Sequence, residues 1–526
     1  MSTRTGTLLA AILGSAIVFL DGTIVNVAVE TIGRELPATF VGVVEGLTYV
    51  NSGYLAVLAA LLILAGAVSD YYGRRRMFRI GLIGFGAASV ACGLAPNMEI
   101  LILSRLVQGV FGAVLVPGSL AIITATFSGE DRGRAIGLWA AGTSATNVLG
   151  PFVGGFLVQS VSWRAAFLIN VPLVLLALYA TRSMLESRDE QAEGRFDWLG
   201  AAVIAIGIGG LAFGATRGAE REWRDTLAFV ALGVGAVATI AFPFLMAVRS
   251  RPLVPLSLFS SRNFTVVNLS TLVIYGALYV TLLFQSLFLQ GTLGYSPVAA
   301  GAVGLPIGIM LTFLSTPAGT LAARWGPRLF LTVGPAIMAL GLLWLARIPP
   351  DSEAWFADLT NPVTLVPPTD VLVDVVAGLV IFGLGISMLV APLTTALMSS
   401  VPVRRAGLGS AINNAVSRAG APLVSAVLFI AITASFFPLL AERVPGLDAE
   451  EARSGPIQPL TSVPEGTDPQ LAAAAREAST DAFHLAMLVA AGLLMAGAAI
   501  NAVGISNRAA GAAGETEQQP TAASAG

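Results

Sequence analysis

The sequence contains no lysine, one histidine and one cysteine, and only 11% of its 526 residues are charged. Cys92 has no second cysteine to pair with, so an internal disulfide is impossible. His484 alone cannot supply the usual zinc-binding sets and gives no basis for a Ser-His-Asp triad. A G-x-x-x-x-G-K-[ST] phosphate loop is also absent, which excludes a nucleotide-driven pump. A soluble domain carries about 25% charged residues, so this composition argues against a water-covered surface.

Apolar residues are abundant instead, because they make up 55% of the chain and the mean hydropathy is +0.80. A helix needs about 20 apolar residues to cross a hydrocarbon core of about 30 Å. Long Leu, Ala, Val and Gly runs satisfy their backbone in lipid as helices rather than barrel strands. The sequence therefore predicts an all-α membrane protein with fourteen transmembrane helices. The predicted segments are 8–29, 47–69, 77–95, 99–126, 135–159, 165–183, 198–216, 226–247, 264–289, 298–322, 328–347, 371–397, 407–435 and 482–504.

Arginine placement predicts the orientation of these helices. An even number of spans puts both termini on one side, where the loops and ends collect 18 arginines against 9 on the other. Because positive charge accumulates in cytoplasmic loops, both termini are predicted to be cytoplasmic. The absence of lysine and the heavy use of Ala and Gly favour a bacterial source, and hence the bacterial cytoplasmic (inner) membrane.

A G-x-x-x-D-x-x-G-R-R-R motif follows the second predicted helix, and residues 319–328 carry a degraded copy of it. Its glycines permit close helix approach and a tight turn, while its acid can cap a helix and pair with arginine. A repeated basic loop of this kind is typical of transporters built from parallel repeats. We call this the cytoplasmic gate motif, and its residues are Gly66, Asp70, Gly73, Arg74 and Arg75.

Four further stretches carry small and polar residues in characteristic order. They are Leu20-Asp21-Gly-Thr23-Ile-Val-Asn26 in helix 1, Leu103-Ser-Arg105-Leu-Val-Gln108-Gly109 in helix 4, Gly150-Pro151-Phe-Val-Gly154-Gly155 in helix 5, and Ala391-Pro392-Leu-Thr-Thr with Arg405-Ala-Gly407 through Asn413-Asn414 in the late helices. In this combination and order, the sequence resembles the major facilitator superfamily, and within it the fourteen-helix drug:proton antiporters. The resemblance runs over nearly the whole chain.

The resemblance implies a major-facilitator bundle, in which two six-helix halves surround a central cavity and two extra central helices pack outside the transport core. The expected organisation is an N-terminal half (1–190), two inserted helices (191–262), a C-terminal half (263–507) with outer loops at 348–370 and 436–481, and a disordered cytoplasmic tail (508–526). The loop at 348–370 suits a short interfacial turn or helix, and the loop at 436–481 a partly ordered segment.

Three ionisable residues, Asp21, Arg105 and Arg418, lie well inside predicted spans. An intramembrane charge costs about 2.5–3.5 kcal/mol on insertion scales, so each is a functional candidate. At about 1.5 Å per residue, Asp21 and Arg105 lie at nearly equal depth and can meet. We expect them to couple transport to protons, because burial favours a neutral carboxyl group whereas a nearby arginine favours the carboxylate. The alternative is a static pair, with Arg105 as a packing hub.

Two motifs suggest moving parts. Asp70 with Arg74 and Arg75 is expected to latch the cytoplasmic side, although a plain topology signal would also account for the arginines. The helix-5 glycines and proline resemble the antiporter motif of exporters and imply a bendable, close-packing helix that seals the cavity. Tight packing alone is the alternative for this motif.

Other polar residues fall on helices expected to face the cavity, where each is either a substrate contact or an interhelical hydrogen bond. They are Asn26, Asn147, Tyr275, Tyr279, Gln285, Asn413, Asn414 and Arg418. Arg418 could instead pair with a carbonyl or reach toward water. Two arginines and one aspartate sum to +1 within the membrane, which weakens the case for lipophilic cations and leaves neutral or anionic cargo open.

The predicted function is export of small, lipophilic molecules such as drugs and antibiotics in exchange for protons, by alternating access. A dedicated exporter of one metabolite or self-made antibiotic, or a non-transporting membrane sensor, is the alternative. No enzyme activity, no metal and no cofactor is expected, since the proton gradient supplies the energy. The expected partners are substrate, protons and the lipid bilayer, without nucleic acid, and the expected state is a monomer.

Overall fold

The structure is a computed structural model that describes residues 2–37, 43–188, 196–220, 225–358, 361–454, 457–464 and 466–507. Within these ranges the chain forms helices and no strand. Each predicted segment falls on one helix or on consecutive helical pieces. The prediction of an all-α membrane fold is therefore confirmed.

The first part of the chain forms α1–α7, and α6 and α7 together cover the sixth predicted span. The bounds are α1 (Thr3–Glu35), α2 (Val43–Tyr72), α3 (Arg74–Gly93), α4 (Met98–Thr126), α5 (Gly129–Ser160), α6 (Ala165–Leu168) and α7 (Asn170–Ala180), then the turn η1 (Thr181–Ser183). Local chemistry sets the ends. Gly73 separates α2 from α3 with a φ of 106°, which favours glycine. Asn97 caps α4 by accepting from the Ile100 amide at 2.9 Å.

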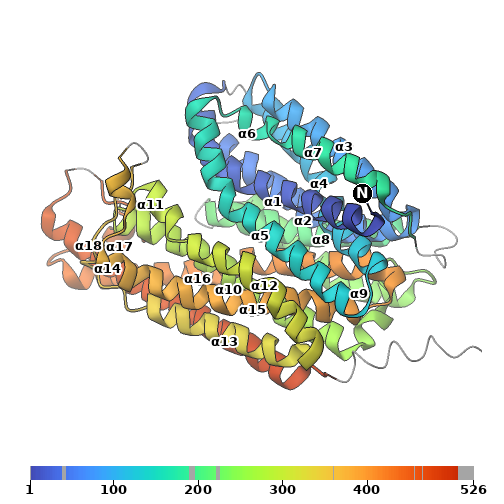
Figure 1. The fold of residues 1–526 in the computed structure, drawn as a ribbon. Coiled ribbons are helices and arrows are strands. Elements are labelled where there is room, and N and C mark those ends of the chain that lie inside the picture. Colours follow the sequence, from blue (N-terminus) through green and yellow to red (C-terminus); the bar gives the residue numbers. More distant parts are fainter. Residues whose placement is uncertain are drawn as a thin grey trace, which may run out of the picture.

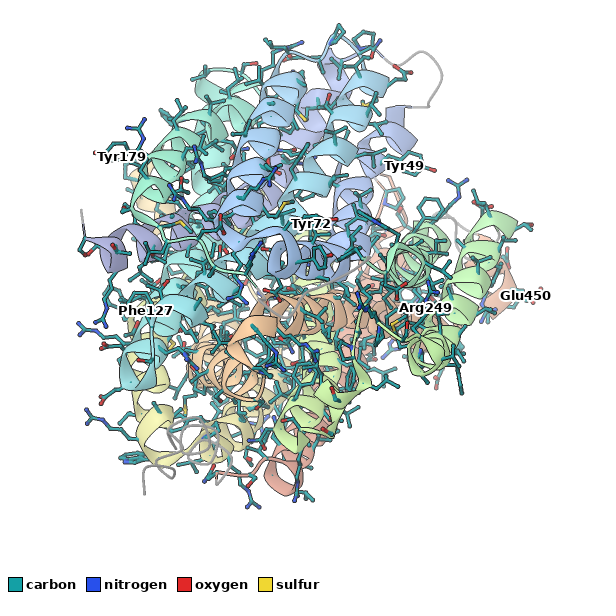
Figure 2. The ribbon with its side chains drawn as sticks, turned by 90° about the vertical axis from the view of Figure 1, so that its right-hand side faces the viewer. Tyr49, Tyr72, Phe127, Tyr179, Arg249 and Glu450 are labelled. Carbon is teal, nitrogen blue, oxygen red and sulfur yellow. The ribbon has the colours of Figure 1, made fainter. Side chains whose placement is uncertain are left out.

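The two inserted helices are α8 (Trp198–Glu220) and α9 (Thr226–Val248). They pack backbone to backbone, because a Cβ on Gly210 would lie 2.9 Å from the Gly235 Cα. α8 contacts α2 and α16, so it touches both halves of the molecule. Seen along the helices, the green α8–α9 pair lies at one side of the bundle (Figure 2).

The last part of the chain forms α10–α18 and five short 3-10 or π turns. The bounds are η2 (Leu256–Ser260), α10 (Arg262–Leu287), η3 (Phe288–Thr292), α11 (Pro297–Ala302), α12 (Leu305–Trp325), α13 (Pro327–Leu345), η4 (Pro362–Leu365), α14 (Thr369–Val371), η5 (Leu372–Val376), α15 (Ala377–Ser399), η6 (Val403–Arg405), α16 (Ala406–Arg443), α17 (Ala449–Ser454) and α18 (Pro469–Gly504).

Eleven helices in the described part of the chain are long and apolar enough to cross a membrane. The other three predicted spans lie on α3, α5 and α16, so the fold is compatible with fourteen spans, a count that stays a prediction. Helix extends further into the predicted outer loop 436–481 than expected, since α16 continues to Arg443 and α18 begins at Pro469. Arg443 pairs with Glu477 and Asp481, so the extended end of α16 is joined to α18.

The two halves meet at the end of the bundle that holds the N-terminus, and α6 and α11 lie apart at the opposite end (Figure 1). One seam joins α2 to α16, where a Cβ on Gly66 would lie 2.4 Å from the Ala411 Cβ. A second seam joins α5 to α12, where a Cβ on Gly137 would lie 2.8 Å from the Thr316 Cα. Small residues thus let the halves close at the end that is predicted to be cytoplasmic.

Candidate functional site

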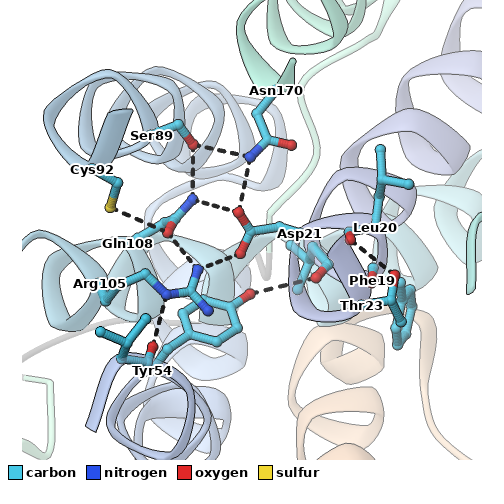
Figure 3. A network of polar contacts seen from close by, with 12 residues as sticks. Phe19, Leu20, Asp21, Thr23, Tyr54, Ser89, Cys92, Arg105, Gln108 and Asn170 are labelled. Atoms are coloured by element: carbon cyan, nitrogen blue, oxygen red, sulfur yellow. Dashed lines mark hydrogen bonds and ion pairs between the residues drawn. The ribbon is translucent and has the colours of Figure 1, made fainter. Parts of the chain in front are cut away.

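Asp21 and Arg105 form a fully buried ion pair inside the first half (Figure 3). The Arg105 Nη1 donates to the Asp21 Oδ2 at 2.5 Å, and both residues are 0% exposed. Asp21 comes from α1 and Arg105 from α4, so two helices bring the charges together. The contact between Asp21 and Arg105, which their nearly equal depth in the membrane made possible, is therefore present.

Two amides complete the carboxylate's surroundings. Gln108 of α4 donates to the Asp21 Oδ1 at 3.0 Å, and Asn170 at the start of α7 donates to the same oxygen at 2.9 Å. Both amides also donate to the Ser89 hydroxyl of α3, at 2.8 and 3.3 Å. We call Asp21, Arg105, Gln108, Asn170 and Ser89 the Asp21 network, and its members are all fully buried. Because every described contact of the carboxylate is with a donor, the network fits its ionised form.

Arg105 is held from several sides. Its Nε donates to the Val50 carbonyl at 2.9 Å, its Nη1 donates to Gln108 at 2.7 Å, and its guanidinium lies 4.0 Å from the centre of the Tyr54 ring. Two buried atoms of the network have no partner in the described part of the chain, the Arg105 Nη2 and the Asn170 Oδ1. A protonated Asp21 would need an acceptor, and the Asn170 amide already carries a free one beside it.

Sequence reasoning found only part of this network. Gln108 belongs to the helix-4 motif, and its place three residues after Arg105, on the same helix face, is the signal that points to it. Asn170 stands two residues before Pro172 within an apolar run, and the helix is interrupted there, between α6 and α7. Ser89 and Tyr54 offer no comparable signal.

At the end where the halves meet, Asp70 of α2 caps the N-terminus of α16. Its carboxylate accepts from the Gly407 and Leu408 amides at 3.2 and 2.8 Å, and from the Arg74 Nε at 2.8 Å. These amides belong to the first turn of a helix, where amides lack partners within the helix. Arg74 in turn donates to the Val403 carbonyl at 2.6 Å. Asp70 and Arg74 thus tie the first half to the second.

Arg75 does not join this contact, although the sequence grouped it with Arg74. Its side chain donates to the Arg182 carbonyl at 3.5 Å, within the first half. The backbone amides of Arg75 and Arg76 donate to Glu186 at 3.0 and 3.1 Å, so Glu186 caps α3. A Cβ on Gly73 would lie 2.9 Å from that carboxylate, which gives the second motif glycine a local reason.

The helix-5 motif packs α5 against α1. A Cβ on Gly150 would lie 1.9 Å from the Thr23 Oγ1, and one on Gly154 would lie 3.2 Å from the Ile24 Cα. The Thr23 hydroxyl donates to the Leu20 carbonyl at 2.9 Å, next to Asp21. The described glycines therefore fix the position of α1 at the ion pair. Pro151 and Gly155 fall outside the described side chains, as do Asn26 and Asn147.

The remaining cavity candidates differ in their surroundings. Asn413 of α16 donates to Thr271 and Asn268 of α10 at 2.9 and 3.3 Å, so it makes an interhelical bond. Asn414 donates to the Ser410 carbonyl of its own helix at 3.0 Å.

The other candidates lie on α10 and α16. Tyr275 and Tyr279 place their ring centres 6.1 Å apart, and Tyr279 is 37% exposed. Gln285 is buried, and its Oε1 has no partner in the described part of the chain. Arg418 is half-buried. The described residues contain no group of three or more His, Cys, Asp or Glu that could hold a metal ion.

Comparison with known proteins gives these contacts a context. The family model of the Major Facilitator Superfamily matches residues 11–425. The multidrug resistance protein Stp of Mycobacterium tuberculosis is 32% identical over 444 residues, which cover 84% of this chain and 78% of Stp. The tetracenomycin C resistance and export protein of Streptomyces glaucescens is 31% identical over 425 residues, which cover 80% of this chain and 74% of that relative.

The fold also matches solved structures. The proton:xylose symporter XylE superimposes with a TM-score of 0.57 at 17% sequence identity, over 93% of this chain and 94% of XylE. At this identity the likeness concerns the fold alone.

Proposed function

The chain belongs to the major facilitator superfamily, and from this membership we propose that it exports small lipophilic molecules, drugs and antibiotics among them, in exchange for protons. The prediction of a multi-pass membrane transporter, and not an enzyme, is confirmed by the family. The proposal goes beyond family membership in three respects: the direction is export, the exchanged ion is the proton, and the cargo is small and lipophilic. Its setting would be the bacterial cytoplasmic membrane, with both termini inside and the protein acting as a monomer.

The observation that carries the proposal is the ion pair of Asp21 and Arg105, buried at 0% exposure within the first half. A carboxylate placed at membrane depth beside one arginine changes its proton affinity whenever that arginine moves. Proton uptake at Asp21 would release Arg105, and proton loss would restore the pair. The cycle would then tie helix positions to the protonation of one side chain.

The contact of Asp70 with α16 supplies the matching conformational step. With the halves joined at the predicted cytoplasmic end, the path would be open only to the outside, and protons would enter there. Opening the cytoplasmic end would break the bonds of Asp70 to Gly407 and Leu408, and would let cargo enter. Export follows if cargo leaves before the next proton binds.

An exporter of a single antibiotic is the second candidate. One relative is named for resistance to and export of tetracenomycin C, whereas Stp is named for multidrug resistance. A substrate panel separates these candidates, since a dedicated exporter would respond to one compound class.

The proposal is tested in proteoliposomes with an acid lumen and a trapped pH dye. Adding ethidium, puromycin or a tetracycline to the outside should raise the lumen pH as the compound accumulates inside. Collapsing the gradient with nigericin should stop accumulation. Accumulation that persists without a gradient would contradict proton exchange, and binding without accumulation would indicate a sensor.

Replacing Asp70 with asparagine should lower turnover about tenfold, because charge-assisted hydrogen bonds contribute about 1.5–3 kcal/mol. The substitution weakens the hydrogen bonds from Gly407 and Leu408 that hold α16 to α2. The halves would therefore close less often at this end. Initial rates in the proteoliposome assay measure the change. Membrane insertion should be unchanged. The control is Asp131→Asn at the same end, whose carboxylate pairs with Arg4 in an exposed ion pair. Equal rates for Asp70→Asn and wild type would refute the latch.

A further inference from the structure

Arg418 of α16 is the charged residue at membrane depth that the proposed proton exchange does not use. We propose that Arg418 binds the negatively charged group of the substrate, so that the preferred cargo is a lipophilic acid. This proposal rests on the proposed transport function and adds the charge of the cargo.

The helix geometry places Arg418 on the face of α16 that meets the first half. Ala411 lies against Gly66 of α2, and Arg418 follows Ala411 by seven residues, which is two turns along the same face. Gly420 supports this orientation, because a Cβ there would lie 2.5 Å from the Leu272 carbonyl oxygen of α10. Residues two apart do not share a helix face, so Arg418 points away from α10.

The depth of Arg418 brings it to the level of the Asp21 network. It lies twelve residues after the start of α16, or about 18 Å along a helix that crosses a core of about 30 Å. α16 packs against α2 and α4, which carry Tyr54 and Arg105, and the Tyr54 ring lies 4.0 Å from the Arg105 guanidinium. Arg418 therefore faces the part of the first half that holds the proton-coupling pair.

No described residue neutralises Arg418. It makes no hydrogen bond and no ion pair within the part of the chain that the structure describes. Asp21 is not a counterion for it, because Arg105, Gln108 and Asn170 already occupy that buried carboxylate. The described charges at this level therefore sum to +1, and the positive charge belongs to Arg418.

An unpaired charge within a membrane protein is expensive, and such charges usually face a partner or a water-filled path. Arg418 is half-buried, whereas Arg105 is 0% exposed, so only Arg418 can be reached from outside the protein interior. A guanidinium offers paired N–H donors in a planar fork that matches a carboxylate. A lipophilic acid would supply both the missing counterion and the apolar body expected of the cargo.

The test compares 7-methoxycoumarin-4-acetic acid with its N-methylamide, which shares the ring and lacks the charge. Equilibrium dialysis against the purified full-length protein at pH 7 measures both dissociation constants. Wild type should bind the acid about tenfold more tightly than the amide, as expected for a charge-assisted hydrogen bond. Arg418→Gln should remove this preference, and Arg418→Lys should retain part of it, because lysine keeps the charge but lacks the planar fork. The control is Arg347→Gln, at the end of α13, where the arginine lies over Trp344.

The unfolding temperature of each variant shows whether it is folded, so that loss of binding can be told apart from loss of the fold. The acid should raise the unfolding temperature of wild type and leave that of Arg418→Gln unchanged. A wild type that does not prefer the acid, or an Arg418→Gln variant that keeps the preference, would overturn the proposal. Failure of the proposed function looks different, because no compound, ethidium included, would then release protons, whatever the binding preference.

Discussion

Replacing Asp21 with asparagine should reduce substrate accumulation driven by a pH gradient to the level of protein-free liposomes. Asparagine has the same shape as aspartate but takes up no proton, so net transport would lose its driving force. The fold should survive, because the one amide oxygen that remains can still accept either from Gln108 and Asn170 or from Arg105. The measurement is uptake of a fluorescent substrate into liposomes with an acid lumen.

Exchange of labelled for unlabelled substrate separates this outcome from simple inactivation. Exchange needs no net proton movement, so Asp21→Asn should retain it while uphill transport is lost. The matched control is Asp197→Asn, another buried carboxylate, which accepts from the Gly200 amide of α8 and from the Leu253 amide beyond α9. That variant should accumulate substrate normally. Wild-type accumulation by Asp21→Asn would mean that Asp21 and Arg105 form a static pair.

The meeting of Asp21 and Arg105 could be predicted because it depends on two quantities that a sequence provides. Hydropathy sets where each helix enters the membrane, and a fixed rise per residue converts position into depth. Charged side chains are also rare in such segments, so few combinations were possible. The helix boundaries and the membrane class follow from the same signals.

The neutral members of the network could not be identified in this way. Ser89 and Asn170 are short polar residues of a kind that recurs in many apolar helices. Their bonds to Gln108 and Asp21 depend on how α1, α3, α4 and α7 are rotated about their axes. Packing between the helices sets these rotations, and they cannot be predicted from hydropathy.

The gate motif shows the same limit. Its sequence predicted that Asp70 would pair with an arginine and cap a helix, and Arg74 lies one turn away in the pattern. The helix that Asp70 caps begins more than 300 residues later, at Ala406. Arg74 and Arg75 are adjacent in sequence, but adjacent residues point to different sides of a helix, and only Arg74 reaches the second half.

Replacing Gly66 with valine should remove most transport activity by keeping the halves apart at the predicted cytoplasmic end. Even a single added carbon would lie 2.4 Å from the Ala411 Cβ and 2.6 Å from the Gly407 carbonyl oxygen. A β-branched side chain cannot rotate out of this contact, and overpacking typically costs about 1–3 kcal/mol. A penalty of that size shifts the balance between the two conformations by about fivefold to 150-fold. Both halves would remain folded, since the clash lies between them.

Spin labels across the second seam report this shift without touching the first. Glu130 of α5 and Arg324 of α12 form an ion pair between the halves at 2.7 Å, so cysteines at these two positions start close together. The native cysteine is buried and single, and a Cys92→Ala background removes it. Pulsed electron paramagnetic resonance should show longer distances with Gly66→Val than in the parent.

The control for this experiment is Gly233→Val on α9, where an added carbon meets no atom within 4 Å. That variant should keep the short distances and normal transport. Short distances in Gly66→Val together with full transport would show that α2 and α16 need not approach closely. Short distances with lost transport would place the defect elsewhere in the cycle. Longer distances with lost transport would make the small residues at Gly66 and Gly407 a condition for closing the end where Asp70 caps α16.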